Sequence, residues 1–240
     1  MSIVAPAQGG TPRLEEVLRQ AGAVFADHQG RPAALHFGSA AGELSVCVRA
    51  VGLVDRSDLT TLALEGPRAQ LAQLTSRLAG GEIAPGGALD AAGAWWCGAA
   101  PDTVVVVCRP DVGRRLIERL RVHAAQVASL RVLSVDFAVL GLLGPQTPEV
   151  LRSLGVYGPA GNPRDAAPFG RGMIAGGDAW WLLESDHSAL MLVDRGRAGQ
   201  LWRAIENAGR RFGLSCVGRE AAGRYALLER GRNRAATLIG

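Results

Sequence analysis

Two stretches of alternating apolar residues end at the same dipeptide, and each is followed by a helical pattern. Leu62-Ala63-Leu64-Glu65 leads to Gly66-Pro67, and Leu140-Gly141-Leu142-Leu143 leads to Gly144-Pro145. Alternation is typical of a strand with one buried face, and proline favours the first turn of a helix. In residues 68–80 and 147–155, leucine or valine recurs at a spacing of three or four, which predicts helices with one apolar stripe.

The same order of patterns continues after these helices. Ala94-Trp95-Trp96 is repeated as Ala179-Trp180-Trp181, and each pair adjoins a β-rich run and then a helical segment, at residues 111–124 and 196–213. The predicted unit is a strand, a helix, a hairpin of strands and a second helix, and it occurs twice. Two long units, rather than three or more short ones, predict an α+β fold of two pseudo-repeated subdomains, each an antiparallel sheet with helices.

The repeat suggests how the chain is divided. We expect an N-terminal segment at residues 1–30, a first subdomain at 31–125 and a second at 126–240. The first dozen residues are rich in Pro, Gly and Ala and should be poorly ordered or packed on a neighbour. A ligand is expected in the seam between the subdomains. One tryptophan of each pair should enter a core and the other the seam, because neighbouring strand residues face opposite sides.

Composition limits the classes of function. Hydrophobic residues make up 48% and charged residues 20% of the chain, which is ordinary for a globular protein. The net charge of +4 comes from arginine without any lysine, and no basic run is interleaved with aromatic residues, so no nucleic-acid partner is expected. Without a long apolar run or a signal peptide, we expect a cytoplasmic protein with no membrane contact. The four cysteines form no CxxC pair, which disfavours a zinc site.

The segment "AALHFGSAAGELSVCVRAVGLVDRSDLTTLALEGPRAQ" resembles the N-terminal part of the aminomethyltransferases, the T-proteins of the glycine cleavage system. "LGLLGPQTPEVL" and, more loosely, "GLSCVGREAAGRYALLERG" are similar to later segments of that family, and the tryptophan hairpins resemble the gamma subunit of heterotetrameric sarcosine oxidase. The resemblance covers roughly residues 30 to 231. It implies the folate-binding fold, a folate in a central hole and transfer of a one-carbon unit onto tetrahydrofolate. The chain would stop before the family's C-terminal barrel-like domain, so a partner or a second copy would supply one wall.

The resemblance also implies which residues contact the cofactor. Phe37 replaces a tyrosine and keeps a ring that can stack on a pterin, and Leu59 takes the place of a methionine that faces the hole. Trp95 and Trp96 are candidates for a stacking platform. Glu184 corresponds to a glutamate that grips the pterin, since a carboxylate can accept two hydrogen bonds from an aminopyrimidine edge. Arg224 lies near an arginine that would pair with the glutamate tail of folate.

The catalytic acid of that family has no counterpart here. Trp95, Trp96 and Cys97 stand where its acidic pair is expected. The candidates that remain are Asp102, a nearby carboxylate that a turn role would also explain, and His36, a possible acid or base that can equally be structural.

Three functions stay open. The chain is a tetrahydrofolate-dependent one-carbon transferase with a rebuilt site, a non-catalytic subunit of a larger oxidase or demethylase, or a pseudo-enzyme that binds another flat ligand. The expected partners are a folate or other flat small molecule, and a protein partner or a second copy of the chain.

Overall fold

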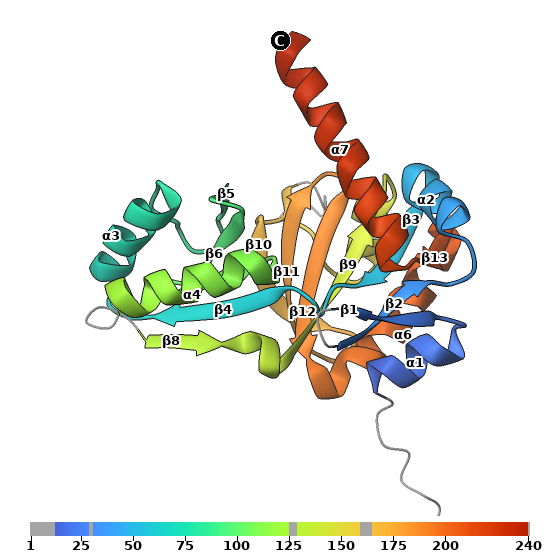
Figure 1. Cartoon of the computed structure of the whole chain (residues 1–240), viewed down its shortest axis with the longest axis horizontal. Coiled ribbons are helices and arrows are strands. Elements are labelled where there is room, and N and C mark those ends of the chain that lie inside the picture. The colour runs from blue at the N-terminus through green and yellow to red at the C-terminus, as the bar shows by residue number, and fades with distance from the viewer. Residues whose placement is uncertain (1–12, 29–30, 125–128, 159–164, 240) are drawn as a thin grey trace, which may run out of the picture.

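The computed structural model describes residues 13–28, 31–124, 129–158 and 165–239, and Figure 1 shows their arrangement around two sheets. The expectation of poor order in the first dozen residues falls outside this part of the chain. The expected α+β class is confirmed, because antiparallel sheets are combined with helices that cover them.

The first sheet has five strands in the order β5-β6-β7-β4-β8. Their bounds are β5 (Ala88–Ala91), β6 (Ala94–Ala100), β7 (Thr103–Cys108), β4 (Thr60–Glu65) and β8 (Ser129–Val132). Helices α3 (Arg68–Ala79) and α4 (Pro110–Ala124) pack on one face, where Leu71, Leu74 and Leu78 meet Leu62 and Leu64 of β4. The leucine stripe recognised in residues 68–80 is therefore the buried side of α3.

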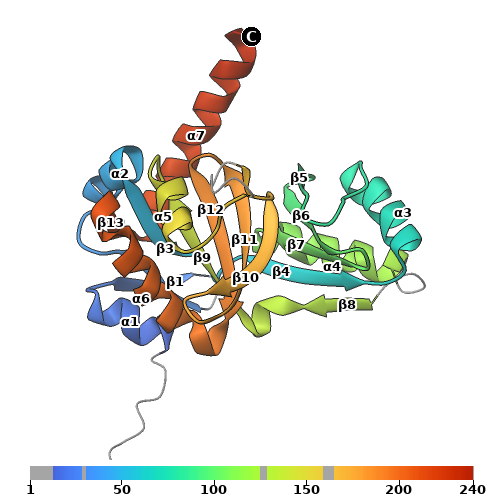
Figure 2. The ribbon, with the colours of Figure 1, turned by 180° about the vertical axis from the view of Figure 1, so that it is seen from behind.

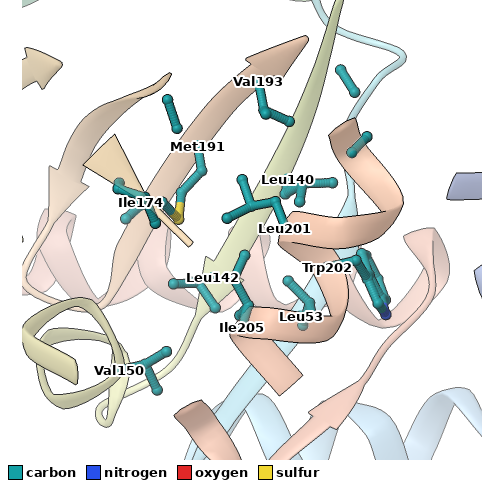
Figure 3. Packing of buried hydrophobic residues seen from close by; sticks show 14 of the residues in the cluster. Leu53, Leu140, Leu142, Val150, Ile174, Met191, Val193, Leu201, Trp202 and Ile205 are labelled. Carbon is teal, nitrogen blue, oxygen red and sulfur yellow. The ribbon is translucent and has the colours of Figure 1, made fainter. Parts of the chain in front are cut away.

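The second sheet has six strands in the order β10-β11-β12-β9-β3-β13. Their bounds are β10 (Phe169–Ile174), β11 (Gly177–Ser185), β12 (Ser188–Asp194), β9 (Phe137–Leu143), β3 (Val51–Asp55) and β13 (Leu214–Cys216). Helices α5 (Thr147–Ser153) and α6 (Ala198–Gly209) cover its outer face. Figure 3 shows Leu201, Trp202 and Ile205 of α6 against the strand residues Leu53, Leu140 and Leu142, all buried.

The two sheets repeat one topology, as the sequence predicted. The order β5-β6-β7-β4 in the first sheet corresponds to β10-β11-β12-β9 in the second. Each sheet is extended by a strand from the other side of the repeat boundary: β3 precedes the first unit but pairs with β9, and β8 follows that unit and pairs with β4. The proposed division of the chain between residues 125 and 126 stays a prediction, because these strands cross it.

A cluster of apolar side chains packs between the sheets. Leu59, Val105 and Val107 on one side meet Phe169, Leu182 and Leu190 on the other, all buried. Trp95 and Trp180 join this inner cluster, whereas Trp96 and Trp181 lie on the helix-covered faces. The prediction that each tryptophan pair divides between a core and the seam is confirmed.

The remaining elements lie around the edge of the second sheet. Helix α1 (Leu14–Gln20) packs against α6, and the hairpin of β1 (Val24–His28) and β2 (Arg31–His36) lies beside α7 (Arg219–Ile239). Helix α2 (Ala40–Arg49) contacts the beginning of α7, whose other end projects from the body of the protein in Figures 1 and 2. Three short 3₁₀ segments, Leu133–Val135, Arg195–Arg197 and Arg210–Phe212, complete the elements of the described residues. None of the helices in the described part of the chain is both long and apolar enough to cross a membrane.

Candidate functional site

A cavity of about 630 Å³ lies where the N-terminal elements meet the two sheets. We call it the charged cavity. Its lining comes from α1, the β1–β2 hairpin, the end of β3 and the loop to β4, the first turns of α4, Arg195, the first residue of α7, and Val132, Ser134 and Val135. Small-molecule sites in proteins are of this size and combine apolar walls with a few polar groups. Here the apolar part includes Leu18, Phe25, Leu59 and Ile117.

Hydrogen bonds fix the loop from β3 to β4 at one side of this cavity. The Asp55 carboxylate accepts a hydrogen bond of 2.9 Å from the Ser57 N–H, so the aspartate forms a local turn. Arg56 N–H donates to the Val139 carbonyl at 2.8 Å, and the Ser57 hydroxyl oxygen accepts from the Val139 N–H at 3.2 Å. Because both bonds hold the loop to β9, the carboxylates of Asp55 and Asp58 are presented on a rigid segment.

Charged groups of both signs are paired inside the cavity. Arg219 Nη1 lies 2.7 Å from Asp58 Oδ2, and Arg56 Nε lies 3.6 Å from Asp58 Oδ1. Arg219 Nη2 is 2.8 Å from His28 Nε2. Since a guanidinium group can only donate, His28 accepts through Nε2, which requires that nitrogen to be unprotonated. Both side chains of the Asp58–Arg219 pair are largely buried, at 14% and 22% exposure.

Asp55 has a different electrostatic environment from Asp58. Burial raises the pKa of the Asp55 carboxyl group above its ordinary value, and the negative charge of Asp58 acts in the same direction. Hydrogen bonds from Ser57 and the positive charge of Arg195 oppose this effect. The folded protein therefore favours the protonated form of the Asp55 carboxyl group more than water does.

The residues proposed from the sequence are not gathered at one point. Leu59 lines the charged cavity and also packs in the cluster between the sheets. Trp95 lies in that same inner cluster, but Trp96 is 1% exposed on the other face and donates its indole N–H to the Ala91 carbonyl at 3.3 Å. The strand alternation that separates these two rings means that Trp95, rather than Trp96, faces the seam.

The negative charge of Glu184, on β11, acts on Cys97, on β6 of the other sheet. Glu184 lies near the end of β11, where it accepts a hydrogen bond of 2.7 Å from the Ser188 hydroxyl. Its negative charge contributes to raising the pKa of the Cys97 thiol, although burial of this fully enclosed side chain is the larger cause. Cys97 therefore stays a neutral thiol at neutral pH. The role of Glu184 in binding remains a prediction.

Phe37 and His36 lie at the end of β2, near the beginning of α7. The Phe37 N–H donates to Glu43 Oε1 at 2.7 Å, and the Gly218 N–H donates to Glu43 Oε2 at 2.7 Å. His36 accepts a hydrogen bond from the Gly38 N–H through Nδ1 at 3.2 Å. The buried Glu43 carboxylate thus connects this turn to α7, a structural role that the sequence pattern did not reveal.

Two further candidates are exposed. Asp102 lies in the turn between β6 and β7, where it accepts from the Thr103 hydroxyl at 3.2 Å. Arg224 pairs with Glu220 on the surface of α7. The arginine of α7 that lines the charged cavity is instead Arg219. The sequence reasoning missed it, although its position directly after Gly218, at the start of the helical pattern, marks it as the first side chain of α7.

The fold is that of the aminomethyltransferases. Against the glycine cleavage system aminomethyltransferase T from Bartonella henselae the TM-score is 0.70 at 19% identity, covering 87% of this chain. This chain spans only 59% of the length of that protein.

A chain of the heterotetrameric sarcosine oxidase from Corynebacterium sp. U-96 has a TM-score of 0.55 at 21% identity. Here 73% of this chain matches 93% of the other. No family model matches the sequence, and no curated protein matches it. The resemblance seen in the sequence is therefore confirmed as structural similarity at low identity.

Proposed function

We propose that the chain binds a folate in the charged cavity and is a tetrahydrofolate-dependent one-carbon transferase with an altered active site. The observation that carries this proposal is a cavity of about 630 Å³ with paired buried charges, within a fold shared with an aminomethyltransferase. Because the chain covers 59% of that protein, its activity is inferred from the cavity and the fold together.

The lining residues suit the parts of a folate. Phe25 and Leu59 offer apolar surface for a flat ring, and Asp58 offers a carboxylate for the donors of an aminopyrimidine edge. Arg219, inside the cavity, and Arg114, exposed on α4, offer guanidinium groups for the carboxylates of the glutamate tail. Phe37 beside the start of α7, and Trp95 and Glu184 in the seam, are further proposed contacts.

The proposed alteration of the active site concerns the group that exchanges a proton during the transfer. The buried Cys97 thiol is too weak an acid to exchange a proton at neutral pH, since burial raises its pKa. In the charged cavity, burial raises the pKa of the Asp55 carboxyl group above its ordinary value. We propose that Asp55 holds or accepts the proton in any one-carbon transfer, with Asp102 and His36 as the alternatives from the sequence.

Calorimetric titration of the purified chain with tetrahydrofolate tests the binding. Arg219→Met should weaken binding by more than tenfold, because it removes a guanidinium donor to the ligand and the nearer of the two arginines that pair with the buried Asp58. Arg230→Met is the matched control, since Arg230 is exposed on the same helix and, among the described residues, donates to the Ala226 carbonyl alone.

Two further variants locate the ligand. Glu184→Ala should weaken binding if the ring extends into the seam, and Arg224→Met should weaken it if the exposed arginine meets the glutamate tail. If titration with millimolar tetrahydrofolate produces no heat of binding, the folate assignment is wrong. The hypothesis that the chain binds another flat ligand would then remain.

A second candidate is a non-catalytic subunit of a larger oxidase or demethylase. It is favoured by the match to 93% of a chain of a heterotetrameric oxidase and by the projecting end of α7. Leu227 and Leu228 on this helix are 63% and 45% exposed. An isolated helical segment is marginally stable in water, so a partner surface would stabilise it.

Copurification with a defined flavin-containing chain tests this second candidate. Leu227→Glu combined with Leu228→Glu should abolish the flavin absorbance that elutes with the wild-type chain, because charges would replace the apolar contact. Val122→Glu, at an exposed position of α4, is the control. An elution profile without flavin for the wild type would exclude a stable complex of this kind.

A further inference from the structure

A second cavity, of about 650 Å³, lies between the two sheets beside the charged cavity. We call it the aromatic cavity. The two cavities share no lining residue, because the segment 132–135 separates them: Leu133 faces the aromatic cavity, and Val132 and Ser134 face the charged one. The same division occurs at the end of β12, where Asp194 and Arg195 face opposite cavities.

The walls of the aromatic cavity differ in the size of their side chains. On the first sheet, small residues line it: Ala63, Gly98, Ala99, Ala100 and Thr103. On the second sheet, three aromatic rings face them, with Trp180 edge-on to Phe169 at a centroid distance of 5.6 Å and 6.1 Å from Phe137. Packed sheets lie about 10 Å apart, so alanine and glycine opposite a layer of rings leave space for a flat group.

The charges at this cavity favour a positive ligand. Glu65, Asp178 and Asp194 outnumber Arg131 and Arg171 among the lining residues. The Arg171 guanidinium lies 5.9 Å from the centroid of Trp180, so a planar cation already occupies part of the ring face. The side chains of Arg171 and Asp178 are 61% and 59% exposed, and an exposed ion pair of this kind adds little stability. A cationic ligand could therefore displace Arg171 from Trp180 at little cost in free energy.

We propose that the aromatic cavity binds a planar organic cation, a heteroaromatic ring with a permanent positive charge. The ring stacks on Trp180 in place of Arg171, and the carboxylates of Asp178 and Asp194 balance its charge. The face of an indole is the aromatic surface that attracts cations most strongly. This site is independent of the folate proposal, since none of its lining residues contributes to the charged cavity.

Three probes that share one ring test both the site and the sign of its charge: 1-methylnicotinamide is cationic, nicotinamide neutral and nicotinate anionic. Calorimetry and the indole N–H signals of the wild-type chain should show 1-methylnicotinamide bound at least about tenfold more tightly than nicotinate. The indole signal that moves should be the one lost in Trp180→Phe.

Ala99→Leu fills the cavity without removing any of its aromatic wall and should abolish binding of 1-methylnicotinamide. Trp180→Leu should do the same if the variant folds, and Trp181→Phe, on the opposite face of β11, should retain binding. The proposal is overturned if none of the probes binds at millimolar concentration, if nicotinate binds more tightly than the cation, or if Ala99→Leu leaves the affinity unchanged.

Discussion

At the scale of single residues, Asp55 shows how one carboxyl group links the cavity to the stability of the chain. Its pKa is raised in the folded state from a reference value of 3.8, with burial as the largest cause. Folding therefore takes up a proton at this group. The resulting stability is fully present below pH 3.8 and is lost as the pH rises through the folded-state pKa.

Asp55→Asn should remove this pH dependence. The amide oxygen can still accept from the Ser57 N–H, and no charge has to be buried at neutral pH, so Tm should rise by a few degrees at pH 7. The gain over the wild type should shrink toward pH 4. Thermal unfolding from pH 4 to pH 8 measures this, with the exposed Asp102→Asn as control. A lower Tm for Asp55→Asn at pH 7 would mean that attraction to Arg195 outweighs burial.

At the scale of elements, the attachment of α7 depends on one buried glutamate. Glu43 of α2 accepts hydrogen bonds of 2.7 Å from the N–H groups of Phe37 and Gly218, so a single carboxylate joins α2, the end of β2 and the residue before α7. Gly218 itself is required for this approach, because a Cβ there would lie 2.0 Å from the Leu35 carbonyl oxygen. The start of α7, and with it Arg219, is positioned by this contact.

Glu43→Gln should destabilise the fold by about 2–3 kcal/mol, because one charged acceptor becomes an amide donor that faces a backbone N–H. Urea unfolding measures the change, and Glu220→Gln, which removes only an exposed pair with Arg224, should cost at most about 1 kcal/mol. Equal effects of the two substitutions would show that the buried contact is not what holds α7.

At the scale of the whole molecule, the sequence predicted the repeated unit of strands and helices. It did not predict which segments far apart in the chain lie side by side. Alternation and helical spacing locate strands such as Thr60–Glu65 and helices such as Arg68–Ala79, because these signals are local. The paired tryptophans also predicted the two faces of β6 and β11 correctly. The partners of β3 and β8 could not be predicted, since nothing in a strand of four or five residues specifies a neighbour far along the chain.

The candidate site was predictable only in part, for the same reason. Leu59 was found because it takes the place of a methionine in the resembling family, but Arg219, His28 and Asp58 meet through elements far apart in the chain. Arg224 was chosen because it lies near an arginine of the resembling family, and five positions along α7 separate this exposed arginine from Arg219 in the cavity. Glu43 gave no sequence signal, since a glutamate in the first turn of a helix is usually a surface residue.

The exchange of β3 and β8 between the sheets has a consequence for how the chain reaches this structure. β3 pairs with β9 and β13, which are synthesised long after it, and β8 must return to β4 across the whole first unit. The first sheet has all its strands once residue 132 has been made, but β3 then still waits for β9 and, much later along the chain, for β13. Pairing over such separations is slow to form, and it makes the two halves melt together as one cooperative body.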